Sequence, residues 1–267
     1  MRVTAIFLFL ALWADTAISQ DYALRQLEYS PRHQEWVEVQ YDHRTVHSFV
    51  VYPETAENTL TVIVIHENRG LTDWVRSFAD QVAEAGYIAI APDLLSEFDD
   101  EHSRTRDFPN EDAARDALYQ LNPDQITRDL QAIQLYAESL PSADGRTVVS
   151  GFCWGGSQSF RFATNAAGLS AALVFYGSAT NDEERIQQIE APVYGFYGGN
   201  DQRINATIPE IVSLMERYDK FFEYNIYEGA GHGYMRTGDD PDGAEENIRA
   251  RNQSWEWMTQ ILEFLKH

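Results

Sequence analysis

Short strand-like runs alternate with longer helix-like segments along most of this 267-residue chain. The run at residues 61–65, Thr-Val-Ile-Val-Ile, contains only β-branched side chains, which is typical of a strand buried on both faces. A chain in which strands and helices alternate favours a mostly parallel central sheet with helices on both faces. The sequence therefore predicts the α/β fold class.

Residue spacing predicts where the individual elements lie. Strands are expected at residues 36–41 and 46–52, as an antiparallel hairpin, and at 61–65, 87–91, 147–150, 171–176, 193–197 and 222–227. Helices are expected at residues 72–85, 111–121, 123–140, 156–167, 208–218 and 244–265. The polar residues 22–31 are expected to be irregular, and residues 96–109 to form a surface excursion. No linker or internal repeat divides the chain, so residues 20–267 are predicted to form a single domain.

The first 19 residues have the pattern of a secretory signal peptide. Arg2 gives a positive start, residues 6–13 form a short apolar run, and Ala17 and Ser19 are small residues at the spacing of a cleavage site. The run is too short to span a bilayer, and no later stretch of the sequence is apolar for long enough. We expect cleavage near Ser19 and a periplasmic or secreted protein, with an uncleaved anchor as the alternative.

The formal net charge of −22 disfavours binding to nucleic acid and to anionic lipid head groups. We therefore expect a small molecule as the partner, and a monomer as the favoured state. The single cysteine excludes an intramolecular disulfide and a zinc site built from several thiolates. His66-Glu67 lacks the second histidine of a helical zinc site, so neither a metal nor another cofactor is expected.

The single cysteine lies in Gly151-Phe-Cys153-Trp-Gly155, between a strand-like run and a helical segment. In a turn of the form Gly-x-nucleophile-x-Gly, the glycines relieve crowding and the nucleophile is exposed at the carboxyl edge of the sheet. The N–H of the next residue then points to where an oxyanion forms. The pattern predicts that Cys153 is a nucleophile; the alternative is a small apolar residue packed in the core.

Two later residues provide the groups that such a nucleophile needs, a proton acceptor and a partner that orients the acceptor. Asp201 follows the strand expected at 193–197, and His232 follows the strand expected at 222–227. Both therefore fall at the carboxyl edge of the sheet, in the expected order of nucleophile, acid and histidine. Taken alone, Asp201 could be a turn residue, whereas a histidine flanked by glycines is hard to explain by packing.

Five motifs in order resemble the dienelactone hydrolase family, whose cysteine-dependent members have the α/β-hydrolase fold. The resemblance covers the chain from about residue 61 to residue 265. Its motifs are Val64-Ile-His-Glu-Asn-Arg-Gly70, Gly86-Tyr-Ile-Ala-Ile-Ala-Pro-Asp-Leu94, Gly151-Phe-Cys-Trp-Gly-Gly156, Tyr197-Gly-Gly-Asn-Asp201 and Gly229-Ala-Gly-His-Gly-Tyr-Met-Arg236.

The resemblance implies a catalytic triad of Cys153, Asp201 and His232. It further implies that Glu67 meets the resting thiol and promotes its deprotonation, because a thiol is weakly ionised at its ordinary pKa. The implied activity is hydrolysis of an ester or lactone through a thioester acyl-enzyme.

The resemblance also implies how the substrate is held. The backbone N–H groups of Asn68 and Trp154 would bind the oxyanion. Arg236 and Tyr234 would bind the substrate, with the arginine holding a substrate carboxylate.

Two departures from the family pattern bear on the substrate. A second carboxylate-binding arginine is expected in the region after Pro92, but none of Arg104, Arg106 and Arg115 matches clearly. This argues against dienelactone itself, and the export signal points to an extracytoplasmic ester or lactone.

Other functions remain compatible with the same residues. A thiol acyltransferase or a peptidase could use the same fold and nucleophile. A non-catalytic binding protein could keep the pocket without turnover. A redox sensor would need a resolving thiol, and the chain has no second cysteine.

Overall fold

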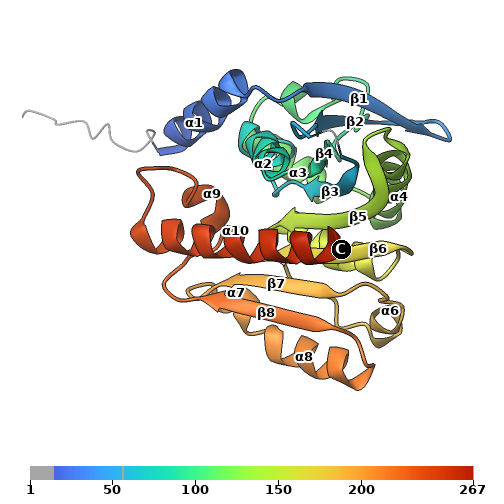
Figure 1. The fold of residues 1–267 in the computed structure, drawn as a ribbon, viewed down its shortest axis with the longest axis vertical. Coiled ribbons are helices and arrows are strands. Elements are labelled where there is room, and N and C mark those ends of the chain that lie inside the picture. The colour runs from blue at the N-terminus through green and yellow to red at the C-terminus, as the bar shows by residue number, and fades with distance from the viewer. Residues whose placement is uncertain (1–14, 56, 267) are drawn as a thin grey trace, which may run out of the picture.

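The computed structural model describes residues 15–55 and 57–266, which build one eight-stranded sheet flanked by helices (Figure 1). The strands are β1 (Gln34–Tyr41), β2 (Arg44–Val51), β3 (Thr59–Ile65), β4 (Ile88–Pro92), β5 (Ala143–Phe152), β6 (Leu169–Phe175), β7 (Val193–Gly198) and β8 (Phe222–Tyr227). The helices are α1 (Asp15–Tyr29), α2 (Asp73–Glu84), α3 (Glu111–Leu118), α4 (Pro123–Ser139), α5 (Trp154–Ala163), α6 (Glu183–Gln187), α7 (Gln202–Asn205), α8 (Ile208–Arg217), α9 (Tyr234–Thr237) and α10 (Glu245–Lys266). A 3₁₀ turn, η1 (Thr105–Asp107), lies between β4 and α3.

The sheet has the strand order β1-β2-β4-β3-β5-β6-β7-β8. The pairs β1–β2 and β2–β4 are antiparallel, and every pair from β4 to β8 is parallel. The predicted N-terminal hairpin and the predicted mostly parallel sheet are therefore confirmed. Every residue of β3 is buried, as its β-branched sequence indicates, because this strand lies inside the sheet between β4 and β5.

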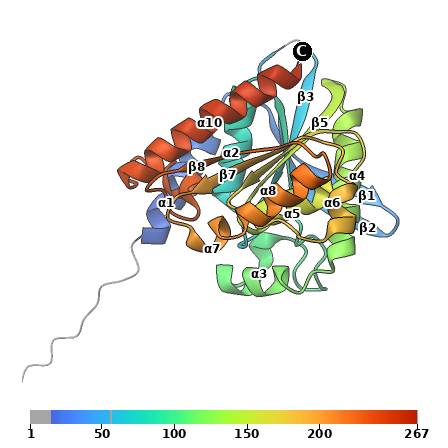
Figure 2. The ribbon, with the colours of Figure 1, turned by 90° about the horizontal axis from the view of Figure 1, so that it is seen from below.

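Helices cover both faces of the sheet (Figure 2). Each face has its own apolar core. On one face, α1, α2 and α10 pack over side chains such as Val62, Val64 and Phe152. On the other, α4, α5 and α8 pack over Ile63 and Val149 and their neighbours. The alternating residues of one strand thus serve two cores, which is the reason that the central strands are apolar without interruption.

The structure corrects the prediction for residues 22–31, most of which lie in α1 rather than in an irregular segment. Ala23 and Leu27 are one helical turn apart and are buried in the core beside α2. Two further boundaries differ: the helix after Cys153 begins at Trp154 and ends at Ala163, and β5 is longer than residues 147–150. The prediction of a signal peptide falls mostly on residues 1–14, which lie outside the described residues.

The carboxyl ends of the parallel strands bring together residues that are far apart in the sequence. Glu67 and Asn68 follow β3, Cys153 follows β5, Asp201 lies after β7, and His232 lies after β8.

In the described ranges, no helix has the length and apolar character needed to cross a membrane.

Candidate active site

Cys153 lies in a strained turn between β5 and α5. Its backbone has φ 55° and ψ −113°, a left-handed φ that a side-chain-bearing residue rarely adopts. Gly151 permits the turn, because a Cβ atom at this position would lie 2.0 Å from the carbonyl oxygen of Gly155. The helix starts at the next residue, so the Cys153 side chain projects from the carboxyl edge of the sheet.

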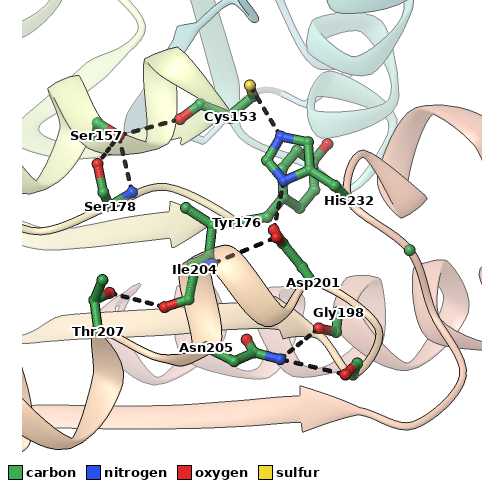
Figure 3. Close-up of polar contacts among 12 residues, drawn as sticks. Cys153, Ser157, Tyr176, Ser178, Gly198, Asp201, Ile204, Asn205, Thr207 and His232 are labelled. Carbon is green, nitrogen blue, oxygen red and sulfur yellow. Dashed lines mark hydrogen bonds and ion pairs between the residues drawn. The ribbon is translucent and has the colours of Figure 1, made fainter.

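The structure brings Cys153, His232 and Asp201 together in one chain of contacts (Figure 3). The Sγ atom of Cys153 lies 3.1 Å from Nε2 of His232, and Nδ1 of His232 lies 2.5 Å from Oδ2 of Asp201. The other Asp201 oxygen accepts a hydrogen bond of 3.4 Å from the backbone N–H of Ile204. Asp201 is therefore both a helix cap and the partner that orients the imidazole.

The backbone N–H groups of Trp154 and Asn68 act on the Cys153 sulfur. They come from different elements, the first turn of α5 and the loop after β3. Both donors favour the anionic form of the sulfur and lower its pKa. An oxygen that develops negative charge beside the sulfur would meet the same two donors.

The thiol of Cys153 is nevertheless held in its neutral form. Burial, followed by the negative charge of Glu67, raises the pKa of Cys153 to about 11. The N–H groups and the positive charge of Arg203 oppose this rise only in part. At neutral pH the sulfur would therefore have to lose its proton in order to act as a nucleophile, and the imidazole of His232 is the group in contact with it.

Glu67 takes a different position from the one that the family resemblance implies. Its carboxylate accepts a hydrogen bond of 2.8 Å from Nε of Arg236 and one of 3.4 Å from the hydroxyl of Tyr176. In the described part of the chain, no hydrogen bond joins the Glu67 carboxylate to the Cys153 thiol. Its charge raises the pKa of Cys153, so in this arrangement Glu67 opposes ionisation of the thiol rather than promoting it.

The implied substrate-binding residues lie away from the cavity at Cys153. Arg236 is committed to Glu67, and this ion pair between a partly buried guanidinium and a buried carboxylate orders both side chains. Tyr234 is fully buried and its hydroxyl lies 2.7 Å from that of Ser254, so a substrate cannot reach it. From the sequence, Tyr234 and Arg236 could not be distinguished from substrate-binding residues, because both follow His232 closely in the chain.

A cavity of about 290 Å³ opens at Cys153. Its walls combine aromatic, hydroxyl and cationic side chains, from Tyr119, Cys153, Trp154, Ser157, Tyr176, Ser178, Arg203 and Ile204. A larger cavity of about 880 Å³ lies beside α1 and α10, but it contains none of the expected catalytic residues. We assign the candidate active site to the smaller cavity because Cys153 lines it, and His232 and the two N–H groups meet at the Cys153 sulfur.

Arg203 is a cavity residue that the sequence analysis did not identify. It is exposed, and within the described residues it has no hydrogen bond or ion pair. The nearest signal was its position two residues after Asp201, at the carboxyl edge of the sheet. Arg104, Arg106 and Arg115 are engaged elsewhere: with His47, with Asp107, and with Asp112 and Asp116.

Tyr176 is a second residue that the sequence analysis did not assign to the site. It follows β6 with φ 40°, and its ring lies edge-on to the imidazole of His232, with 5.1 Å between the ring centroids. The ring is buried and its hydroxyl reaches Glu67. Its place at the end of a central strand was the available signal. In the sequence, however, a site tyrosine at this place looks the same as a tyrosine that packs in the core.

The sheet order and the turn at Cys153 define an α/β-hydrolase fold. A structure described as a dienelactone hydrolase of Klebsiella pneumoniae superposes with a TM-score of 0.76, covering 87% of this chain and 98% of that one. With 20% identity, this likeness speaks for the fold alone.

The chain belongs to the dienelactone hydrolase family, whose sequence model matches residues 46–266. A carboxymethylenebutenolidase-like protein of Saccharolobus solfataricus is 31% identical over 260 residues, with 83% of this chain and 95% of that protein covered. The carboxymethylenebutenolidase of Pseudomonas putida is 24% identical over 202 residues, with 74% and 84% covered. The protein is thus a dienelactone hydrolase-like enzyme, a carboxylic ester hydrolase.

Proposed function

We propose that this protein hydrolyses a small ester or lactone through a thioester on Cys153. The observation that carries the proposal is the contact of 3.1 Å between the cysteine sulfur and His232, with Asp201 on the opposite ring nitrogen at 2.5 Å. The N–H groups of Trp154 and Asn68 at the same sulfur support it, because acyl transfer needs donors for the oxyanion.

In the acylation step, the sulfur attacks the substrate carbonyl carbon while the thiol proton moves to Nε2 of His232. The carbonyl oxygen becomes an oxyanion that accepts hydrogen bonds from Trp154 and Asn68. Asp201 stabilises the imidazolium that forms. The tetrahedral intermediate then expels the alkoxide, which takes the proton from His232, and leaves a thioester on Cys153.

In the deacylation step, His232 removes a proton from water as the water attacks the thioester carbonyl. The same N–H groups bind the second oxyanion. When this intermediate collapses, the thiolate leaves and recovers its proton from His232, and the carboxylic acid is released. The raised pKa of the Cys153 thiol means that the departing sulfur readily takes this proton back from His232.

The dimensions and charges of the cavity indicate the substrate class. A volume of about 290 Å³ is at the small end of ligand pockets, so a compact acyl group fits best. Arg203 supplies a cation at the cavity that has no ion-pair partner in the described part of the chain, and this favours an acyl group that carries an anionic substituent. The name of the relatives, carboxymethylenebutenolidase, refers to a lactone with a carboxyl-bearing substituent and agrees with this class.

The proposal is tested with Cys153→Ala on a panel of small lactones and aryl esters. We expect hydrolysis to fall by about 10³-fold or more, as it does when a nucleophile is removed. The enzyme is also mixed with a labelled substrate and quenched with acid to trap the acyl-enzyme. If the intermediate is a thioester, the label is on Cys153, the only cysteine, and hydroxylamine releases it.

Ser139→Ala, a change on α4 remote from the cavity, is the matched control and should retain wild-type activity. Unchanged hydrolysis by Cys153→Ala would refute the mechanism.

We further propose that the protein is exported and that residues 1–19 are removed. A cut after Ser19 keeps Ala23 and Leu27, the residues of α1 that are buried in the core. Expression of the full chain with a C-terminal tag should give an extracytoplasmic protein that begins at Gln20. Recovery of the intact N-terminus from the cytoplasm would contradict export.

A further inference from the structure

His66 lies at the end of β3, directly before Glu67, and is completely buried. Neither ring nitrogen contacts the cavity at Cys153. Nδ1 lies 2.8 Å from the backbone carbonyl oxygen of Glu67, and Nε2 lies 3.3 Å from the backbone nitrogen of Leu94. A buried histidine with two backbone partners, adjacent to the active site, requires an account beyond core packing.

The two hydrogen bonds determine the tautomer of His66. The Leu94 N–H can only donate, so Nε2 must be the acceptor, and the proton must be on Nδ1. The Nδ1–H then donates to the carbonyl of Glu67, which can only accept. Burial lowers the pKa of His66, because a charged ring would be poorly solvated there, and this also favours the neutral form. Protonation of Nε2 would in addition place two N–H groups against each other.

The Glu67 carbonyl belongs to the same peptide group as the N–H of Asn68. No peptide bond in the described residues is cis, so this C=O and this N–H point in opposite directions. By holding the carbonyl on one side, His66 fixes the direction of the N–H on the other. That N–H is one of the two donors to the sulfur of Cys153.

His66 also contacts the residue that carries the second donor. Its ring stacks on that of Trp154, with centroids 5.5 Å apart and planes inclined by 7°. The backbones pack equally closely there, because a Cβ atom on Gly155 would lie 2.3 Å from the carbonyl oxygen of His66. One side chain therefore links the loop after β3 to the first turn of α5.

We propose that His66 is a positioning residue. It keeps the two oxyanion-binding N–H groups, those of Asn68 and Trp154, at a fixed position and direction relative to each other. The inference rests on the proposed function, since the N–H groups matter only if an oxyanion forms at Cys153. A preorganised pair of donors requires no rearrangement as charge develops in the transition state, and this is the source of its effect on the rate.

The test compares two variants of similar side-chain shape, His66→Leu and His66→Asn. Leucine offers neither a donor nor an acceptor, whereas asparagine keeps an N–H that can donate to the Glu67 carbonyl. We expect His66→Leu to lower kcat about 10- to 100-fold with KM within about threefold, since a donor is loosened rather than deleted. His66→Asn should recover most of the loss. Equal losses in both variants would overturn the proposal.

Alkylation of Cys153 by iodoacetamide separates positioning from general damage. This reaction needs the sulfur but forms no oxyanion, so His66→Leu should slow it only a few-fold. A loss of alkylation in proportion to the loss of hydrolysis would show that the change disturbs the thiol or the fold instead, and would count against the proposal.

The wild-type full chain supplies a measurement that does not depend on the activity of any variant. In ¹⁵N-histidine NMR spectra, His66, identified by its absence from His66→Asn, should be a neutral Nδ1–H tautomer that does not titrate between about pH 5 and pH 9. An Nε2–H tautomer or titration in this range would overturn the inference. This outcome is independent of the Cys153→Ala assay, so a failure of the proposed function and a failure of this inference are distinguishable.

Discussion

At the scale of single residues, Glu67 has the least expected environment. Its carboxylate is bound by Arg236 and faces a thiol whose pKa it helps to raise to about 11. A carboxylate beside a thiol can act in two opposite ways: it accepts the proton, or it repels the thiolate. The structure described favours repulsion, because the hydrogen-bond partners of the carboxylate are Arg236 and Tyr176 and not the thiol.

The Glu67→Gln variant distinguishes these two roles. If the carboxylate repels the thiolate, its removal lowers the pKa of Cys153, and alkylation at pH 8 becomes faster, by about tenfold for each pKa unit. In the wild type, the rate should keep rising with pH towards about 11 without a plateau at neutral pH. Glu111→Gln removes a carboxylate that pairs with Arg69 and is the control. Slower alkylation in Glu67→Gln alone would show that Glu67 primes the thiol.

Arg203 is the residue that we expect to set substrate charge preference. The Arg203→Gln variant should raise KM about tenfold for an ester with a carboxylate on its acyl group, as expected for the loss of one charge-assisted hydrogen bond. KM for the uncharged analogue should stay within about twofold. Arg106→Gln, at an exposed arginine in η1, should change neither value. Steady-state kinetics on the two substrates would contradict this role if both KM values rose together.

At the scale of elements, a buried carboxylate on α2 connects this helix to the segment that enters the sheet. Asp80 has no exposed surface and accepts hydrogen bonds from Ser30, Arg32 and Gln34, at 2.5 to 3.2 Å. This network fixes the end of α1 and the start of β1 on α2. The order of the N-terminal segment therefore depends on one side chain distant in sequence.

We predict that Asp80→Ala lowers the free energy of unfolding by about 3–5 kcal/mol, because the largely buried side chain of Arg32 loses its closest partner and keeps only the longer contact of 3.9 Å with Glu84. Urea unfolding monitored by circular dichroism measures the change. Asp116→Ala, which removes an exposed partner of Arg115, should leave the unfolding midpoint unchanged. If the two variants unfold at the same urea concentration, the network at Asp80 contributes little to stability.

The prediction of elements succeeded where a pattern is local and repeated. The buried run of β3, the hairpin and the helices at α2, α4 and α8 all follow from side-chain spacing within a few residues. α1 was missed because, among residues 22–29, only Ala23 and Leu27 are buried in the core, and two apolar positions are too few to reveal a helical period. Packing on α2 supplies the stability that this segment lacks by itself.

At the scale of the whole molecule, the net charge of −22 opposes the approach of the anionic substrate that Arg203 would favour. The protein's field acts over many ångströms and is screened by salt, whereas the contact with Arg203 is short and is screened less. Raising the ionic strength from about 0.01 M to about 0.15 M shortens the Debye length from about 30 Å to about 8 Å.

We therefore predict that kcat/KM for a carboxylate-bearing ester rises several-fold over this range of ionic strength, while kcat/KM for its neutral analogue stays constant. The comparison within one enzyme preparation controls for direct effects of salt on stability. A fall in kcat/KM for the anionic ester would mean that local attraction by Arg203 outweighs repulsion by the whole surface.

The sequence by itself determined the alternation of strands and helices, and the order in which Cys153, Asp201 and His232 follow their strands. These properties depend on local spacing and on the rule that parallel strands end at one edge. Only the tertiary structure decided that Glu67 pairs with Arg236, 169 residues away, that His66 holds the Asn68 peptide group, and that Arg203 faces the cavity. Side-chain partners across such separations depend on the packing of the whole sheet and its loops, and no local pattern in the chain encodes those distances.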